Sequence, residues 1–249
     1  MISTTLMEKL LQLRLPAFRD GLREQVSNPQ YAQLSFEDRL LLLVELECTR
    51  RLDSRTKRRL KLAEFPMRST VEDLDFSPER GLERRLVLEL AQCTWVDKAL
   101  NILVSGATGT GKSFVACSLG TAAIRLGYTV RYFHTARFLL SLTRARQDGS
   151  YLNLLRSLSR IDVLILDDWM RDPIQLSGAQ DLLEVFDDRF GKSATIIISQ
   201  VPVSGWHARF PDPTLADAIL DRTVHNAYTL ALLGDSQRKL RGFRTMAHT

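Results

Sequence analysis

One glycine-rich octapeptide constrains this chain more than any other feature. Residues 106–113 read GATGTGKS, which fits the phosphate-binding pattern G-x-x-x-x-G-K-[ST]. The apolar run Leu100–Ser105 predicts a strand before this loop, and the sequence from Lys112 to Leu126 predicts a helix after it, ended by Gly127. Because a phosphate-binding loop needs this strand–turn–helix context, we expect the chain to bind a nucleotide.

The loop predicts a role for each of its residues. Glycines allow backbone N–H groups to turn inward around phosphate oxygens, and the helix N-terminus adds a partial positive charge. Lys112 would reach the β- and γ-phosphates, and the Ser113 hydroxyl would bind Mg²⁺. The expected nucleotide contacts are Gly106, Thr108, Gly109, Thr110, Gly111, Lys112 and Ser113.

Two further strands are expected to end in polar side chains. The run Ile161–Leu166 predicts a strand followed by Asp167 and Asp168, at the edge where open α/β sheets bind ligands. Asp167 would hold Mg²⁺ through water, and Asp168 would orient or deprotonate the attacking water. The strand Ala194–Ser199 leads to Gln200, which would sense the γ-phosphate or position water. An ordinary polar strand end is the competing interpretation of Gln200.

Strands and helices alternate along most of the chain, which predicts an α/β fold. Continuous apolar runs between helices are typical of a parallel sheet buried on both faces. Thr214 and Asp217 are expected to cap the helix that carries Arg222. The predicted strands are Leu100–Ser105, Tyr128–His134, Ile161–Leu166, Ala194–Ser199 and Ala227–Leu233.

The first quarter of the chain is helical in pattern. Pro16 is expected to begin one helix, and Ser35 with Asp38 to cap another. Helical periodicity is lost around Glu64–Pro78, which contains two prolines. The expected domains are a small all-helical N-terminal domain at 1–63, a linker at 64–80 and the nucleotide-binding domain at 81–249.

Composition excludes several classes of protein. Hydrophobic residues make up 45% of the chain and charged residues 25%, which is typical of globular proteins. No uncharged apolar run approaches the ~18 residues of a membrane span, and charges in the first apolar stretch argue against a signal peptide. The 3 cysteines are widely spaced and fit a reducing compartment. We therefore expect a cytoplasmic protein without a membrane partner.

Five stretches of the sequence together resemble a known family. They are GATGTGKS (106–113), LILDDW (164–169), TIIISQVPVSGWH (195–207), DPTLADAILDRTVHNA (212–227) and GDSQRK (234–239). Over nearly its whole length the chain looks like the IstB-like transposition helper ATPases of insertion sequences. It is more distantly similar to the DnaC-like helicase loaders, and both groups belong to the AAA+ superfamily. The resemblance implies an AAA+ core, with a parallel five-stranded sheet between helices, that hydrolyses ATP.

The same resemblance implies roles for three residues and a set of partners. Arg222 matches the arginine finger, which reaches the γ-phosphate of a neighbouring subunit. Gln200 matches the first sensor position, and Arg238 matches the second sensor arginine. The implied partners are double-stranded DNA, a DDE-type transposase and further copies of the chain, with ATP between subunits. The implied function is an ATP-dependent transposition regulator that assembles on target DNA, deforms it and recruits or activates the transposase, with hydrolysis controlling disassembly.

Two departures from the family pattern lie in the acidic motif. AAA+ proteins usually have glutamate where this chain has Asp168, a shorter acid. After Trp169 the family tends to have glycine, whereas here the sequence continues Met-Arg-Asp. The loop beyond the acidic pair is therefore expected to differ.

Positive charge indicates where DNA would bind. The net charge is +5, and residues 50–61 contain seven basic side chains against one acid. We favour contact with DNA phosphates, although the transposase or a neighbouring subunit would also suit this run. Helices after the second strand line the DNA path in related loaders, so arginines there are further candidates; a solvated helix face is the alternative. The candidate DNA contacts are Lys57, Arg58, Arg59, Arg137, Arg144 and Arg146.

Two other functions remain open from the sequence. A helicase loader would use its N-terminal domain to hold a helicase and would prefer single strands. A small-molecule kinase would need an arginine-rich lid and an acceptor pocket, and no such lid is evident.

Overall fold

The structure, a computed structural model, describes residues 3–236 and divides the chain into two compact units. The units are residues 1–58 and residues 59–249. The boundary falls inside helix α3, Phe36–Ala63, which ends where the helical periodicity of the sequence is lost. Every helix within residues 3–236 is too short or too polar to span a lipid bilayer.

Helices build the N-terminal unit: α1 (Thr4–Gln12), α2 (Pro16–Ser27), the short 3-10 helix η1 (Pro29–Gln33) and the start of α3. Pro16 is the first residue of α2, as predicted. The predicted cap of α3 is also present, because Ser35 Oγ accepts from the backbone N–H of Asp38 at 3.1 Å. Helices α2 and α3 pack together at Gly21, where an added side chain would meet the ends of the Leu43 and Leu46 side chains.

A buried acid closes the N-terminus of α2. Glu47, on α3, accepts hydrogen bonds through Oε2 from the backbone N–H groups of Ala17 (2.9 Å) and Phe18 (3.2 Å). Arg51 donates to the other carboxylate oxygen at 2.9 Å. Burial by itself would raise the pKa of Glu47. The Arg51 guanidinium and the two backbone donors outweigh burial, so the pKa is lowered from its ordinary value of 4.5.

A parallel five-stranded sheet forms the centre of the second unit and confirms the predicted fold class. Its strand order is β2-β3-β4-β1-β5. All adjacent strands pair in parallel. Each strand begins within two residues of its predicted start. The strands are β1 (Asn101–Gly106), β2 (Val130–His134), β3 (Val163–Asp167), β4 (Ala194–Ser199) and β5 (Ala227–Leu232).

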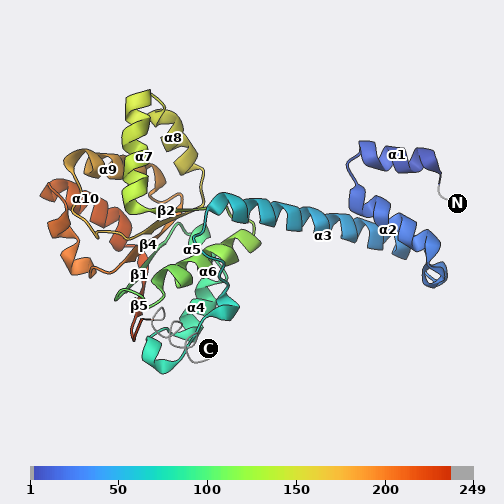
Figure 1. Ribbon diagram of the computed structural model, residues 1–249, viewed down its shortest axis with the longest axis horizontal. Helices are drawn as coiled ribbons and strands as arrows, with labels where there is room; N and C mark the ends of the chain where they lie inside the picture. The colour runs from blue at the N-terminus through green and yellow to red at the C-terminus, as the bar shows by residue number, and fades with distance from the viewer. Residues whose placement is uncertain (1–2, 237–249) are drawn as a thin grey trace, which may run out of the picture. The chain divides into compact units, whose positions relative to one another are not determined.

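Helices cover both faces of this sheet (Figure 1). Alternate residues along β1 enter opposite cores: Ile102 and Val104 pack in one, and Leu103 packs in the other. This burial on both faces explains the continuous apolar runs in the sequence. One face is covered by α4 (Arg84–Leu90), α5 (Thr94–Asp97) and α6 (Lys112–Arg125), the other by α7 (Thr135–Asp148), α8 (Tyr151–Ser159), α9 (Leu176–Arg189) and α10 (Pro213–Val224).

The strand order places the polar strand ends side by side. Because β4 lies between β1 and β3, the residues that follow these three strands meet at one edge of the sheet. The predicted cap of α10 is wrong. Asp212, before Pro213, accepts from the backbone N–H of Leu215 at 2.9 Å, so the helix begins before Thr214 and Asp217.

Candidate nucleotide-binding site

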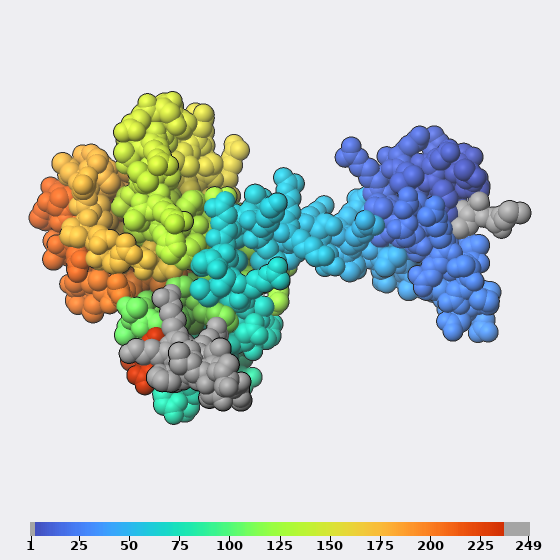
Figure 2. Space-filling view, in the orientation of Figure 1, coloured from blue at the N-terminus to red at the C-terminus, as the bar shows by residue number. Residues whose placement is uncertain are grey.

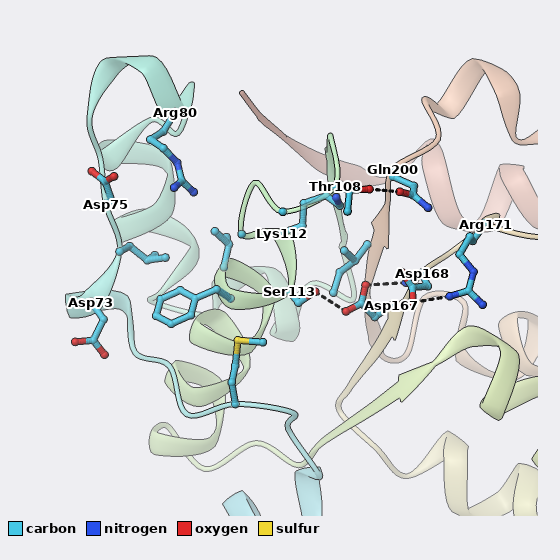
Figure 3. A pocket seen from close by; sticks show the side chains of 17 residues that line it. Asp73, Asp75, Arg80, Thr108, Lys112, Ser113, Asp167, Asp168, Arg171 and Gln200 are labelled. Carbon is cyan, nitrogen blue, oxygen red and sulfur yellow. Dashed lines mark hydrogen bonds and ion pairs between the residues drawn. The ribbon is translucent and has the colours of Figure 1, made fainter. Parts of the chain in front are cut away.

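A cavity of about 480 Å³ opens where β1, β3 and β4 end. Residues of the phosphate loop lie in its middle, between two groups of side chains (Figure 3). Asp167, Asp168 and Gln200 lie on one side, and Asp75 and Arg80 lie on the other (Figure 3). The cavity therefore brings together the two motifs that the sequence predicted to cooperate.

The phosphate loop has the backbone geometry that its glycines permit. Gly109 and Gly111 have φ values of 86° and 90°, in the left-handed region that other residues avoid. Helix α6 begins at Lys112, so its N-terminal N–H groups face the cavity end of the loop. Lys112 Nζ donates to the carbonyl oxygens of Gly106 and Ala107, each at 2.8 Å. A bound phosphate would compete with these carbonyls for the ammonium group.

Ser113 and Asp167 meet across the cavity floor. Ser113 Oγ donates to Asp167 Oδ2 at 2.6 Å, and the backbone N–H of Asp168 donates to Asp167 Oδ1 at 2.7 Å. The Asp167 side chain is buried among hydrophobic strands, with 5% of the residue exposed. Hydroxyl and carboxylate oxygens are the ligands that Mg²⁺ prefers.

The residue set fits a magnesium ion held together with phosphates. Within residues 3–236, no group of three or more His, Cys, Asp or Glu side chains could hold a metal. Mg²⁺ commonly takes only one or two protein ligands and completes its shell with water and substrate phosphates. Ser113 and Asp167 are the residues that would hold it.

Asp168 lies in a strained turn with charged neighbours. Its φ is 56°, a left-handed value that is costly for a non-glycine residue. The turn is fixed because the Trp169 N–H donates to the carbonyl of Ile198 at 2.9 Å. Arg171 Nη1 donates to Asp168 Oδ2 at 3.2 Å, and His134 Nδ1 lies 3.5 Å from the same oxygen. Arg171 belongs to the Met-Arg-Asp sequence that departs from the family pattern, and it pairs with Asp168.

Gln200 contacts the phosphate loop directly. Its Oε1 accepts from Thr108 Oγ1 at 2.5 Å, although 92 residues separate the two in sequence. The side chain lines the cavity next to the acidic pair (Figure 3). This position suits a group that responds to the terminal phosphate.

Arg80 is a cavity residue that sequence reasoning missed. It belongs to the stretch expected to be a linker, yet it is 8% exposed and its Nη2 donates to the carbonyl of Thr110 at 2.6 Å. The backbone carbonyl of Arg80 also accepts from the Leu233 N–H at 2.9 Å, at the end of β5. No sequence signal separates this arginine from a surface one. The same stretch supplies other cavity residues, namely Met67, Asp73, Leu74 and Asp75.

The segment after β5 approaches the phosphate loop. A side chain at Gly109 would collide with Ser236, the last residue that the structure describes. Ser236 belongs to the GDSQRK stretch, residues 234–239. Arg238, the predicted second sensor, lies outside the described residues.

Arg222 lies at the opposite end of the sheet from this cavity. Its backbone carbonyl accepts from Asn101 Nδ2 at 3.0 Å, and Asn101 is the first residue of β1, whereas the phosphate loop follows the last. The six residues of β1 extend over about 20 Å. The Arg222 side chain pairs with Asp187 and donates to the carbonyl of Ala218 at 2.7 Å. It therefore does not join the residues that the structure gathers around the chain's own cavity.

The candidate DNA contacts differ in their surroundings. Arg137 and Arg144 both line a groove of about 460 Å³ between α7 and α8. Arg146 instead pairs with Asp181 at 2.5 Å and lies 3.8 Å above the Tyr151 ring, so it holds α7, α8 and α9 together. In the first unit Lys57 and Arg58 are exposed, and Arg59, at the start of the second, is half-buried.

Sequence comparison decides the family. A model of the IstB-like ATP binding protein family, IstB_IS21, matches residues 8–244. The chain belongs to this family. An insertion sequence ATP-binding protein of Sinorhizobium fredii is 41% identical to this IstB-like chain over 239 residues, covering 96% of the chain and 98% of that protein. The IS21 ATP-binding protein of Pseudomonas aeruginosa is 30% identical over 233 residues, covering 94% and 87%.

Solved structures similar to this IstB-like chain have the AAA+ P-loop fold. The crystal structure of the DnaC helicase loader matches with a TM-score of 0.53 and 14% identity, over 70% of this chain and 99% of that one. AMPPCP-bound DnaA from Aquifex aeolicus matches with a TM-score of 0.58 and 16% identity, over 74% of this chain and 56% of that one. At these identities the likeness shows the fold alone, and it agrees with the predicted AAA+ core.

Proposed function

We propose that this IstB-like chain is an ATP-hydrolysing, DNA-binding regulator of transposition. In the cytoplasm it assembles on double-stranded target DNA in its ATP-bound form, deforms the DNA, and recruits or activates a DDE-type transposase. Hydrolysis then controls disassembly. The insertion sequence relatives support a role in transposition, and the nucleotide cavity supports the use of ATP.

The position of Arg222 is the observation that carries the proposal. The chain's own cavity gathers Lys112, Ser113 and the two aspartates, but Arg222 lies about 20 Å away across the length of β1. A trans arginine accelerates comparable NTPases by ~10³–10⁵-fold. If Arg222 acts on phosphate, it acts on nucleotide bound by another copy. Hydrolysis then depends on assembly, as a regulated complex requires.

Residues of the cavity divide the chemistry among themselves. Lys112 exchanges its carbonyl partners for the β- and γ-phosphates, and Ser113 with Asp167 holds Mg²⁺, which offsets phosphate charge. Asp168 accepts the proton of the attacking water or orients it. Gln200, linked to Thr108, responds to the γ-phosphate. The second sensor role of Arg238 remains a proposal from the resemblance.

Duplex DNA is proposed to bind the groove between α7 and α8. Residues of α7, in yellow-green, form part of the exposed surface of their unit (Figure 2). Arg137 and Arg144 lie seven residues apart on one helix, so they share a face and line the same groove. The exposed Lys57 and Arg58 add a second candidate contact to phosphates.

Nucleotide-dependent bending of a duplex tests the function. A short duplex carrying a donor and an acceptor fluorophore at its two ends is titrated with the full chain, with and without a non-hydrolysable ATP analogue and Mg²⁺. We expect energy transfer to rise only with the analogue, and we expect no such rise in the Lys112→Ala variant. Addition of the transposase encoded beside the gene should then give a supershifted complex only on the bent duplex.

Competition with single strands separates the proposal from helicase loading. An excess of single-stranded DNA should not displace the chain from duplex. Preferential binding to single strands, with no bending of duplex, would instead indicate a DnaC-like loader and would overturn the transposition proposal.

A further inference from the structure

A buried tyrosine contacts the acid expected to hold magnesium. Tyr132 on β2 donates its hydroxyl to Asp167 Oδ2 at 2.6 Å, across the pairing of β2 with β3. It is 5% exposed, and its ring packs edge-on against His134 with centroids 5.4 Å apart. This hydrogen bond plays no part in the roles assigned above.

Two hydroxyl groups share one carboxylate oxygen. Ser113 Oγ and Tyr132 Oη both donate to Asp167 Oδ2, each at 2.6 Å. The Ser113 hydroxyl is expected to bind the metal, so metal binding would replace its hydrogen bond to Asp167. Tyr132 is buried within the sheet, and its hydroxyl is not expected to bind the metal.

The hydroxyl of Tyr132 is a buried donor in a fixed position. A tyrosine hydroxyl has an ordinary pKa of about 10, so it is neutral and carries its proton near neutral pH. A neutral donor of fixed geometry can hold a carboxylate rotamer without neutralising its charge.

We propose that Tyr132 is a positioning residue for the metal: its hydroxyl orients the Asp167 carboxylate toward Mg²⁺ when Ser113 leaves that carboxylate. Partners behind a metal ligand typically change metal affinity or activity by about 10–100-fold when removed. The inference rests on the proposed nucleotide site, because it concerns the same Asp167. It adds a residue that neither the motifs nor the resemblance assigned.

The chain offers a matched control just before the same strand. Tyr128 also donates to an aspartate, Asp97 Oδ1, at 2.6 Å. It precedes β2, whereas Tyr132 lies within the strand and near its carboxyl end. Tyr128→Phe and Tyr132→Phe thus delete the same atom and the same kind of hydrogen bond, and only the second bond involves the site.

The test measures how much Mg²⁺ tightens nucleotide binding. The affinity of the full chain for a fluorescent ATP analogue is measured in EDTA and in saturating Mg²⁺, and the ratio of the two dissociation constants is compared among wild type, Tyr132→Phe and Tyr128→Phe. We expect Tyr132→Phe to bind within about twofold of wild type in EDTA, while its Mg²⁺ enhancement falls about 10-fold or more. Tyr128→Phe should keep the wild-type ratio.

Two results would overturn the inference. One is an unchanged Mg²⁺ ratio in Tyr132→Phe. The other is loss of EDTA binding together with a lowered melting temperature, which would make Tyr132 a structural residue only. Failure of the proposed function can be told apart from failure of this inference. A wild-type chain that binds nucleotide with Mg²⁺ but does not bind duplex DNA would contradict the proposed function, and the Mg²⁺ ratio of Tyr132→Phe could still be measured.

Discussion

Arg222 forms an ion pair with Asp187 of its own chain, at the opposite end of β1 from the phosphate loop. The guanidinium donates further to the carbonyl of Ala218. Phosphates of a neighbouring subunit would have to attract Arg222 away from Asp187. In the proposed trans role, Arg222 would therefore have to leave Asp187 and the Ala218 carbonyl before it could reach a neighbour's nucleotide.

Removal of Arg222 should abolish hydrolysis and spare binding. We expect Arg222→Ala to keep ATP affinity within about threefold of wild type, because the residue lies far from its own cavity, while turnover falls by about 10³-fold. Fluorescent-nucleotide titration and phosphate release measure the two effects. Arg156→Ala, an exposed arginine on α8, serves as the control and should change neither.

Mixing two inactive variants tests whether Arg222 acts across subunits. Asp168→Asn should bind ATP and hydrolyse it slowly, leaving long-lived DNA complexes. A mixture of Asp168→Asn and Arg222→Ala creates some interfaces with an intact acid and an intact arginine, so turnover should exceed that of either variant alone by about tenfold or more. Absence of rescue would place Arg222 in its own active site or outside catalysis.

Lys112→Ala should remove nucleotide binding and, with it, assembly. Its ammonium group faces the loop carbonyls and is the principal positive charge offered to the β- and γ-phosphates. We expect affinity for Mg²⁺-ATP to fall by about 100-fold, since hydrogen bonds to charged groups contribute about 1.5–3 kcal/mol each. Size-exclusion chromatography with ATP and duplex should show no large complex. Full assembly of this variant would contradict the phosphate-site interpretation.

Release of Arg171 from Asp168 should accelerate hydrolysis. The ion pair occupies the oxygen that would accept a proton from water, and both side chains are partly exposed, at 48% and 40%. Such pairs contribute at most about 1 kcal/mol, so Arg171→Ala should raise the single-turnover rate by up to about fivefold. ATP affinity should not change. A slower rate would instead indicate that Arg171 assists the reaction.

The three arginines of α7 should separate into two classes. Arg137→Ala and Arg144→Ala should each weaken duplex binding uniformly across sequences and lower the salt slope by about 0.9 per contacted phosphate. Arg146→Ala should lower the melting temperature, because Asp181, with a 2% exposed side chain, loses its partner. Equal salt slopes for all variants and wild type would exclude this groove as the DNA path.

Acid should loosen the N-terminal unit through Glu47. Because the pKa of Glu47 is lowered from 4.5 in the folded chain, its contribution is complete above pH 4.5 and is lost as the pH falls through the folded pKa. Glu47→Ala should cost about 1–2 kcal/mol at pH 7, comparable to loss of a helix cap. Hydrogen exchange of peptides covering α2 measures both effects. Exchange in the variant and wild type should converge in acid.

Much of the site could be predicted because its chemistry is local in sequence. The phosphate loop and the acidic pair each follow a strand directly, and parallel strands bring their carboxyl ends to one edge. Gln200 follows a strand in the same way, and the structure brings it into contact with Thr108 of the phosphate loop. The AAA+ core is confirmed by the sheet and its neighbours.

What escaped prediction depends on contacts between distant segments. Tyr132 has the pattern of an ordinary strand residue, and only its pairing beside β3 brings it to Asp167. Arg80 is separated by 30 residues from Thr110, whose carbonyl it binds. In sequence Arg146 resembles the other arginines of α7, and only the fold brings Asp181 of α9 into contact with it. The sequence predicts that α10 begins near Thr214, but Asp212 caps the helix and Pro213 is its first residue.

The closeness of Ser236 to Gly109 has a practical consequence. We expect a nucleotide that enters the loop to change the surroundings of Ser236, since the two segments lie in contact. A dye attached through Ser236→Cys would therefore report occupancy of the loop in real time. Cys93 and Cys117 are buried, so Cys48 is the native thiol to replace before such labelling.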